Sequence, residues 1–400
     1  MKRRRVKITG IGFVTPAGIG KEAFWQGIME PVSRVTAVKR FPEEAGAFVA
    51  AEVKGFRLED YVDGVNSKRL PRHTQLAIAA ASLAAADAKL TLGGLRTRNA
   101  LVMIGATLMD FGVINKGVEL IVRKGPNNAL PTSVANALVS AIGASISDLI
   151  AGPTRTMSLQ SACCSGLDAI GRAADMIATG EAEIAICGGA EAPLYFHPML
   201  ELKLAGLAPG NPDFAERQCR PFDAWRTTGV IGEGACVVVL ESEASSSEEY
   251  AFVAGYGYAS DTPGNSCDGL FEAIRLALAN ASLRPNEVES ISAWGPGHKS
   301  LDAAEAQVLA KFFGVHLQTI PVVSLKGAIG NPLGAAGAIQ IGCAALGLQR
   351  GAIPGTVNWT YPDPACPLQL SSVPRYVEHR NVLVNAHGLS GTNACLVLTR

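Results

Sequence analysis

The chain has 400 residues, with 35 Lys and Arg against 35 Asp and Glu, so its formal net charge is zero. A protein that binds nucleic acid through the phosphate backbone should be basic, so the charge excludes that class. Hydrophobic residues make up 48% and charged residues 18%. This composition is typical of a globular protein with a large core and excludes disordered and collagen-like chains.

The N-terminal segment MKRRRVKITGIGFVTPAG begins with the basic flank of a signal peptide. Gly10, Gly12 and Pro16 interrupt its apolar stretch, so we predict a strand and a turn instead of an export signal. No apolar run approaches about eighteen residues, and we expect no membrane span. The nine cysteines include no C-x-x-C pair. We therefore expect no metal site, no disulfide framework and a reducing, cytoplasmic location.

Strand-like runs alternate with Ala-rich helical runs along the chain. The pattern predicts a strand over 6–14, a helix over 72–90 and a strand over 100–107. Such alternation favours an α/β architecture with largely buried sheets.

Three N-terminal segments have counterparts in the C-terminal part. The pairs are KITGIGFVTP (7–16) with FVAGYGYASD (252–261), GEGACVVVL (232–240) with GTNACLVL (391–398), and GLDAIGRAADMIATGEAEIA (166–185) with GAAGAIQIGCAALGLQRGAIP (334–354). We therefore predict two similar halves, residues 1–245 and 246–400, joined near the linker-like ESEASSSEEY. Chance similarity among Gly-rich and Ala-rich segments is the alternative.

The segment over 156–180 predicts a short strand, a tight turn and an amphipathic helix closed by Gly180. Cys163 and Cys164 fall where the helix begins. The unpaired N–H groups and the positive end of the helix dipole favour a thiolate there, which can attack a thioester. Gly166 lowers the stability of the helix by about 1 kcal/mol relative to Ala. Its presence therefore indicates that another group approaches the helix backbone closely. Small buried core residues are the alternative interpretation of the two cysteines.

SACCSG and six further segments, in the same order, resemble the β-ketoacyl synthases of the thiolase superfamily. The resemblance places Cys163 at the acylated position. The further segments are VKITGIGFVTPAG (6–18), ATGEAEIAICGGAEA (178–192), RPFDAWRTTGVIGEGA (220–235), SAWGPGHKSLDAAEAQVLAKFFG (292–314), VVSLKGAIGNPLGAAGAI (322–339) and NAHGLSGTNACLVL (385–398). This resemblance implies the five-layer αβαβα thiolase fold with two fused halves and, commonly, a dimer.

Two departures from the family bear on its chemistry. Decarboxylating members pair the cysteine with two histidines, or a histidine and an asparagine, and these positions here are Trp294 and Asn331. An amide can donate a hydrogen bond to an oxyanion as an imidazole can. An indole has one donor and no proton that titrates near neutrality, and losing a preorganised donor costs about 10²–10³ in rate. We therefore expect no ordinary decarboxylative condensation.

The resemblance also places Lys326 at the family's active-site lysine, with Asp302 and Glu305 at their usual acidic positions. A structural ion pair with one of these acids is the alternative role of Lys326. Gln340 replaces a glutamate that is common in the family. Five histidines show no metal-ligand spacing and receive no role: His73, His197, His298, His316 and His379.

The last loop differs from the family's pattern at two aromatic positions, which are His387 and Leu389 here. A histidine beside a thiol can form a Cys–His pair, so His387 is a candidate catalytic residue. A buried structural histidine is the alternative. The resemblance assigns Cys164, Leu389, Gly391 and Trp294 to the substrate pocket.

Two functions remain open. The first is a non-elongating ketosynthase-like subunit, similar to the chain-length factors of type II polyketide systems, and the replaced histidines and Gln340 favour it. The second is an acyltransferase or atypical condensing enzyme that takes an acyl group from acyl carrier protein or coenzyme A. The retained Cys163 and Lys326, and the novel His387, favour this second function. Either one uses an acyl-phosphopantetheine or CoA thioester as substrate, needs no cofactor and forms a homodimer or a heterodimer with a ketosynthase. An active ketosynthase with an unrecognised compensation is a third alternative.

Overall fold

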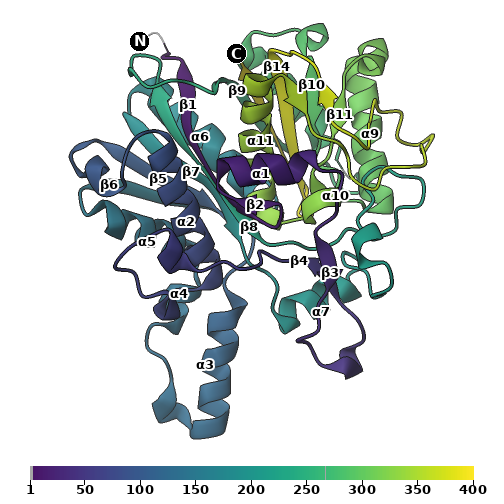
Figure 1. Cartoon of the computed structure of the whole chain (residues 1–400). Coiled ribbons are helices and arrows are strands. Elements are labelled where there is room, and N and C mark those ends of the chain that lie inside the picture. The colour runs from purple at the N-terminus through teal and green to yellow at the C-terminus, as the bar shows by residue number, and fades with distance from the viewer. Residues whose placement is uncertain (1–2, 266) are drawn as a thin grey trace.

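The computed structural model describes residues 3–265 and 267–400 and has a mixed sheet of 11 strands, five or more from each half of the chain (Figure 1). The strands of this sheet are β1 (Val6–Thr15), β2 (Gly18–Ile19), β5 (Ala100–Gly105), β6 (Thr154–Leu159), β7 (Ile184–Glu191), β8 (Gly234–Ser242), β9 (Ala251–Ser260), β10 (Ser290–Ser292), β11 (Val322–Val323), β14 (Asn381–Gly388) and β15 (Thr392–Thr399). Two small sheets pair β3 (Val35–Ala37) with β4 (Val49–Ala51) and β12 (Ala352–Ile353) with β13 (Arg375–Tyr376).

Helices alternate with these strands along the chain, as predicted. The α-helices are α1 (Lys21–Met29), α2 (Arg72–Asp87), α3 (Phe111–Lys124), α4 (Ser133–Ala137), α5 (Ser140–Ile150), α6 (Ser165–Thr179), α7 (Phe196–Leu204), α8 (Gly269–Ala281), α9 (Lys299–Phe313), α10 (Lys326–Ile329) and α11 (Ala336–Arg350). The predicted helix over 72–90 ends three residues early, because Lys89 takes a left-handed φ of 60°. The predicted strand over 100–107 ends at Gly105.

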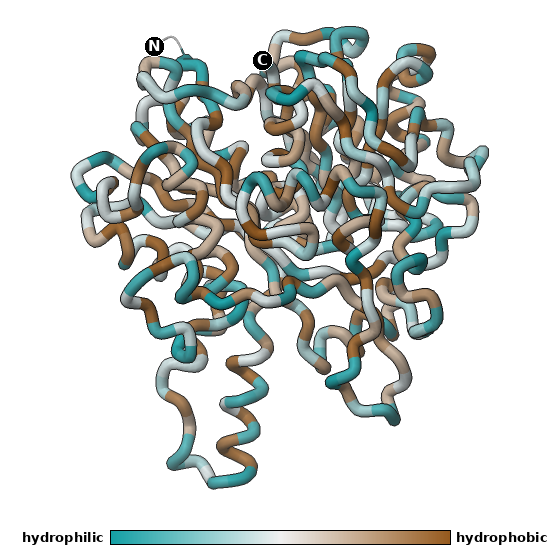
Figure 2. Tube along the Cα trace, viewed as in Figure 1, coloured by the Kyte–Doolittle hydropathy of each residue, from teal (hydrophilic) through white to brown (hydrophobic). Residues whose placement is uncertain are grey.

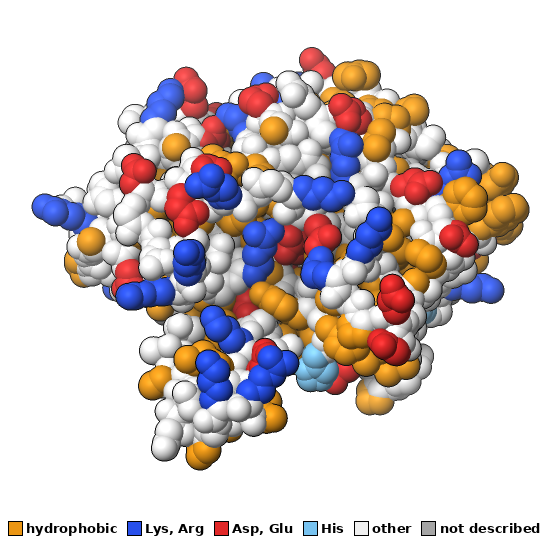
Figure 3. Space-filling model, turned by 60° about the horizontal axis from the view of Figure 1, so that its bottom comes forward, with side chains coloured by type: hydrophobic (Ala, Val, Ile, Leu, Met, Phe, Trp, Pro, Cys, Tyr) orange, Lys and Arg blue, Asp and Glu red, His pale blue; other side chains and the backbone are white. Residues whose placement is uncertain are grey.

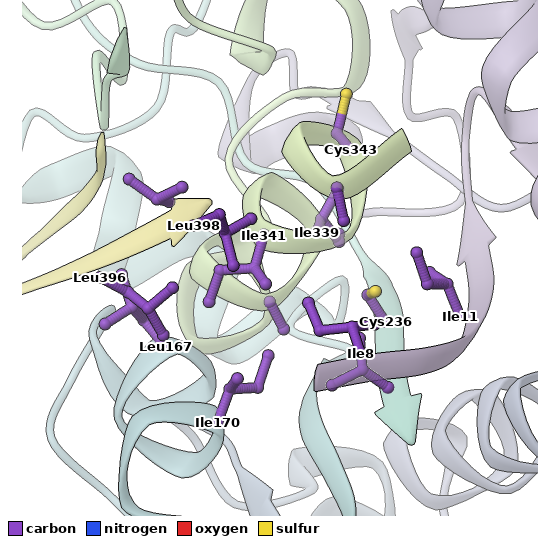
Figure 4. Close-up of a cluster of buried hydrophobic side chains, with 14 of the residues drawn as sticks. Ile8, Ile11, Leu167, Ile170, Cys236, Ile339, Ile341, Cys343, Leu396 and Leu398 are labelled. Atoms are coloured by element: carbon purple, nitrogen blue, oxygen red, sulfur yellow. The ribbon is translucent and has the colours of Figure 1, made fainter. Parts of the chain in front are cut away.

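The five layers follow from which elements share a core. The middle layer is α6 against α11, and their apolar side chains join those of β1, β8 and β15 in one cluster (Figure 4). A second cluster lies between the N-terminal strands and α2 and α5, and a third between the C-terminal strands and α8 and α9. The predicted α/β thiolase-like fold is confirmed.

The sheet repeats one pattern in both halves of the chain. The order β1-β8-β7-β5-β6 has its counterpart in β9-β15-β14-β10-β11. In each run the first two pairings are antiparallel and the last two are parallel. Antiparallel pairing of β1 with β9 joins the runs. The strands of the first two segment pairs, and the helices α6 and α11 of the third, thus occupy equivalent places. The strand that ends the third pair differs, because it is β7 of the main sheet in one half and β12 of a separate sheet in the other. The segment ESEASSSEEY connects β8 to β9.

The glycines of the G-x-G pattern in β1 and β9 allow a helix to pack closely against each strand. A Cβ added to Gly12 would lie 2.0 Å from the carbonyl oxygen of Ala80 in α2. A Cβ added to Gly257 would lie 2.4 Å from the carbonyl oxygen of Ala273 in α8. Glycine is therefore needed for helix–strand packing at equivalent points of both halves.

Figure 2 shows apolar residues concentrated in the strands of the interior, while α3 projects from the body with apolar residues along it. None of the helices in the described ranges is long and apolar enough to cross a membrane. All nine cysteines are free and buried.

Candidate active site

Cys163 lies in the turn between β6 and α6, one residue before the N-cap residue Cys164. Ala162 takes a left-handed φ of 52°, which makes this turn locally strained. The prediction that the cysteines stand at the start of a helix is confirmed. The close approach predicted at Gly166 comes from the other half of the chain, since an added Cβ would lie 2.6 Å from the carbonyl oxygen of Gly334.

The Cys163 thiol is buried, and burial raises its pKa to about 12. The neighbouring Glu191 carboxyl raises this pKa further, while Lys326 lowers it. The structure therefore does not support the prediction that Cys163 is a thiolate. Desolvation of the charged sulfur outweighs the effect of Lys326.

A cavity of about 20 Å³ adjoins Cys163. Trp294, Asn331, His298 and Leu389 line it together with the cysteine. Pockets that hold small-molecule ligands usually measure about 300–1,000 Å³, so this cavity is too small for an acyl chain.

The two residues that replace the family's polarising pair both face this cavity. Trp294 is 1% exposed, and its backbone N–H donates to Glu305 at 2.8 Å. Asn331 is held by its backbone, which donates to the carbonyl oxygen of Val230 at 2.7 Å. Neither Trp294 Nε1 nor Asn331 Oδ1 has a hydrogen-bond partner in the described chain.

Lys326 does not form the ion pair that its position allows. Its Nζ donates to Oε1 of Gln340 at 2.7 Å, and Gln340 Nε2 donates to the carbonyl oxygens of Ser292 and Ala293, both at 3.0 Å. Burial lowers the pKa of Lys326 to about 8, although Glu305 nearby raises it. The substitution at position 340 thus leaves the buried lysine bound to an amide.

His387 lies behind Trp294 and outside the residues that line the cavity. Its Nδ1 pairs with Oδ1 of Asn393 at 2.9 Å, and Asp261 lies 3.9 Å away. Across residues 3–265 and 267–400, no hydrogen bond joins His387 to Cys163. The candidate Cys–His pair is not formed, and the alternative of a buried structural histidine fits the structure, since Trp294 and not His387 lines the cavity with Cys163.

Comparisons with known proteins agree with this geometry. The family model described as "Beta-ketoacyl synthase, N-terminal domain" matches residues 3–246, and "Beta-ketoacyl synthase, C-terminal domain" matches 250–360. The chain belongs to the β-ketoacyl synthase family. It is 31% identical to the 3-oxoacyl-[acyl-carrier-protein] synthase 2 of Coxiella burnetii over 419 residues, covering 100% of this chain and 99% of that protein.

Two solved structures of family members are similar over nearly the full chain. The ishigamide ketosynthase/chain length factor has a TM-score of 0.93 and 31% identity, covering 99% of both chains. A type II polyketide synthase acyl carrier protein in complex with its ketosynthase has a TM-score of 0.89 and 25% identity, again covering 99% of both chains. The β-ketoacyl synthase fold of this chain is therefore shown along its whole length.

Two pocket assignments made from the β-ketoacyl synthase resemblance differ from the structure. Cys164 is turned into the core, where its Sγ donates to the carbonyl oxygen of Thr392 at 3.5 Å. Gly391 takes a φ of 81°, and its carbonyl oxygen accepts from the N–H of Asp261 at 2.7 Å. Neither residue lines the cavity. The Cys164 thiol binds the backbone at the start of β15, and Gly391 lies in the turn between β14 and β15.

His298 is a cavity residue that the sequence analysis left without a role. Its Nδ1 lies 3.2 Å from the Ser300 hydroxyl, and burial and then Arg226 lower its pKa. Asp302 accepts from the backbone N–H groups of Gly297 and His298 and so fixes this loop. His298 follows Trp294 by four residues in the same glycine-rich loop. This spacing could have identified His298 as a pocket residue from the sequence. No cluster of metal-ligating side chains occurs in the described residues.

Proposed function

We propose that this β-ketoacyl synthase family member is a non-elongating, chain-length-factor-like subunit that acts with an active ketosynthase in fatty-acid or polyketide synthesis. The observation that carries the proposal is the position of Trp294, whose indole lines the Cys163 cavity and leaves about 20 Å³. A thiol with a pKa of about 12 supports it, because such a thiol is almost wholly protonated at neutral pH.

Decarboxylation also lacks its usual groups in this pocket. Neither Trp294 nor Asn331 can exchange a proton near neutral pH. His298 lines the cavity, but its lowered pKa makes it neutral and removes the positive charge that would polarise a carboxylate. The subunit is thus expected to leave malonyl groups intact.

The assembly we propose is a dimer, as a heterodimer with a ketosynthase in the first instance and a homodimer as the alternative. Helix α3 projects from the body (Figure 1), and hydrophobic side chains lie on this projection (Figure 3). Val118 and Val122 of α3 are exposed. Strand β6 is an edge of the sheet and exposes Met157. Exposed apolar side chains on α3 and an open strand edge at β6 are both features that fit burial against a second subunit.

Acyl carrier protein is the further partner we propose, in a cytoplasmic setting. The similarity to a ketosynthase solved with its acyl carrier protein supports this partner. Buried free thiols support a reducing compartment. The ligand would be an acyl-phosphopantetheine or CoA thioester presented by the carrier, without a bound cofactor.

Reconstitution with the partner ketosynthase tests the proposal. The complex should make product at nearly the same rate with Cys163→Ala as with the wild-type subunit, and omission of the subunit should abolish or shorten the product. Cys187→Ala, in buried β7, is the matched control for losing a core thiol. A complex that loses activity with Cys163→Ala and keeps it with Cys187→Ala would contradict the proposal.

An acyltransferase is the second candidate, favoured by the retention of Cys163 at a helix N-terminus beside Asn331. Incubation with acyl carrier protein thioesters, followed by mass measurement of the intact chain, distinguishes the two functions. An acyl adduct that forms rapidly and disappears in Cys163→Ala would establish the second candidate, and its absence supports the first.

A further inference from the structure

A short segment of the C-terminal half, residues 331–334, forms part of the wall of the Cys163 cavity. Asn331 and Leu333 of this wall segment line the cavity together with Cys163. Leu333 takes a positive φ of 41°, a strained conformation for leucine that persists only where the surrounding structure holds it. The wall segment therefore needs anchors on both sides of Leu333.

Both anchors of the wall segment come from the N-terminal half. At its start, the N–H of Asn331 donates to the carbonyl oxygen of Val230 at 2.7 Å. The carbonyl oxygen of Asn331 accepts from the N–H of Gly232 at 2.9 Å. At its end, the N–H of Gly334 donates to Oε2 of Glu191 at 3.0 Å. The first anchor is thus backbone pairing, whereas the second depends on one side chain.

Glu191 is the last residue of β7 and is buried. Its Oε2 also accepts from the N–H of Thr107 at 2.7 Å, and its Oε1 accepts from the N–H of Leu108 at 3.2 Å. Both N–H groups belong to the segment that follows β5. Burial raises the pKa of Glu191 to about 7, although the hydrogen bonds from these N–H groups and from Gly334 lower it. One carboxylate therefore ties the end of β5 to the wall segment.

The backbones of the two halves come very close at this point. A Cβ added to Gly334 would lie 2.6 Å from the backbone nitrogen of Thr107. A Cβ added to Gly189 of β7 would lie 2.8 Å from the carbonyl oxygen of Gly334. Glycine at position 334 thus allows its N–H to reach Glu191, and that hydrogen bond holds the wall segment against β5 and β7.

We propose that Glu191 is a positioning residue that anchors the wall segment to the N-terminal half and so keeps Leu333 in the closed wall of the Cys163 cavity. Its carboxylate accepts from the residue next to Leu333, so loss of this acceptor frees the strained leucine to relax. The inference goes beyond the proposed function, because it concerns access to the thiol in the free chain. Its tests need no partner subunit, so their failure and that of the reconstituted complex are separate results.

Two alkylating reagents of the same chemistry and different size test the closure. Iodoacetamide and its bulkier N-phenyl analogue, iodoacetanilide, each form a thioether with the Cys163 sulfur and release iodide. In Glu191→Ala, the rate with iodoacetanilide divided by the rate with iodoacetamide should rise at least fivefold, as measured on the Cys163 peptide by mass spectrometry. A change in the thiolate fraction speeds both reagents equally, so only a wider opening raises this ratio.

Glu241→Ala is the matched control, because Glu241 is a buried carboxylate at the opposite end of the β7–β8 pair. This control should leave the ratio at Cys163 unchanged. Cys187 in buried β7 should stay unlabelled in both variants, since its labelling would report general unfolding. An unchanged ratio in Glu191→Ala, or equal labelling of Cys163 and Cys187, would overturn the proposal.

Glu191→Gln is the conservative variant. Its amide oxygen can still accept from Thr107 and Gly334, so its ratio should stay within twofold of the wild-type ratio. A ratio as high as that of Glu191→Ala would overturn the proposal.

Hydrogen exchange of the wild-type chain tests the anchor even if Glu191→Ala does not fold. The amides of Thr107 and Gly334 share Oε2 of Glu191, so their protection factors, measured by NMR, should differ by less than tenfold. A larger difference would show that the two segments open separately and would overturn the proposal.

Discussion

The indole of Trp294 meets the imidazole of His387 edge to face, with ring centroids 5.1 Å apart and an interplanar angle of 72°. Asn393 binds His387 through Oδ1 and donates from Nδ2 to Asp261 at 2.6 Å. Trp294 and His387 are departures from the family in two separate motifs, and they pack against each other as one unit. The histidine supports the indole that occupies the pocket.

His387→Ala should destabilise the fold by about 2–5 kcal/mol, the usual cost of a large-to-small change in a core. His387→Phe, which keeps an aromatic ring against Trp294, should recover most of this loss. Urea unfolding of the three proteins measures the difference. If His387 were a catalytic base without this packing role, His387→Ala would leave the free energy of unfolding nearly unchanged and would abolish acyl transfer.

Trp294→His should introduce malonyl decarboxylation, which the wild-type chain should not catalyse above background. The change restores an imidazole, which can donate and accept a proton near neutral pH, whereas the indole can only donate a hydrogen bond. General acid–base catalysis by such a group contributes about 10²–10⁴ in rate. Release of CO₂ from malonyl carrier protein is the measurement. Trp225→His, on the exposed surface, is the control. Robust decarboxylation by the wild-type chain would contradict the prediction.

Alkylation of Cys163 by iodoacetamide should be slow at pH 7 and should rise about tenfold per pH unit up to pH 10. The reason is its pKa of about 12, so the thiolate fraction keeps increasing over this whole interval. Peptide mass mapping at each pH separates Cys163 from the other cysteines. A rate that levels off above pH 7 would show a lowered pKa and would favour the acyltransferase function.

Val122→Glu should weaken dimer formation at least tenfold, because Val122 lies on the projecting helix α3 and is 78% exposed. Burying a carboxylate in an apolar interface costs more than the 1.4 kcal/mol that this factor represents. Val315→Glu is the control, since Val315 is 76% exposed and follows α9. Sedimentation at micromolar concentration measures both variants. Equal association of the two variants would place the interface elsewhere.

Gly12→Ala and Gly257→Ala should both destabilise the chain by about 1–3 kcal/mol or more, because each added methyl overlaps a helix carbonyl. The prediction follows from the equivalence of β1 and β9. Gly93→Ala is the control, since its nearest atom, the carbonyl oxygen of Leu149, is 4.0 Å away. Thermal unfolding of the three variants checks it, and a neutral effect at either strand glycine would contradict the proposed packing.

The sequence alone determined the fold class, the duplication and the position of Cys163. These depend on local patterns, namely alternating apolar runs, the paired G-x-G strands and a glycine-closed helix after SACCSG. Local sequence determines such features, so each strand and helix could be predicted from its own residues. The identities of Trp294 and Asn331 in the pocket were also predicted from ordered motifs.

Only the tertiary structure decided the state of the site. Helix position predicted a thiolate at Cys163, but burial by residues from distant segments raises its pKa to about 12. The roles of Cys164, Gly391 and His298 were likewise set by which backbone turns toward the cavity. The desolvation of Cys163 and the packing around it depend on all the residues that surround the site. These residues come from both halves of the chain, so no local sequence pattern predicts their combined effect.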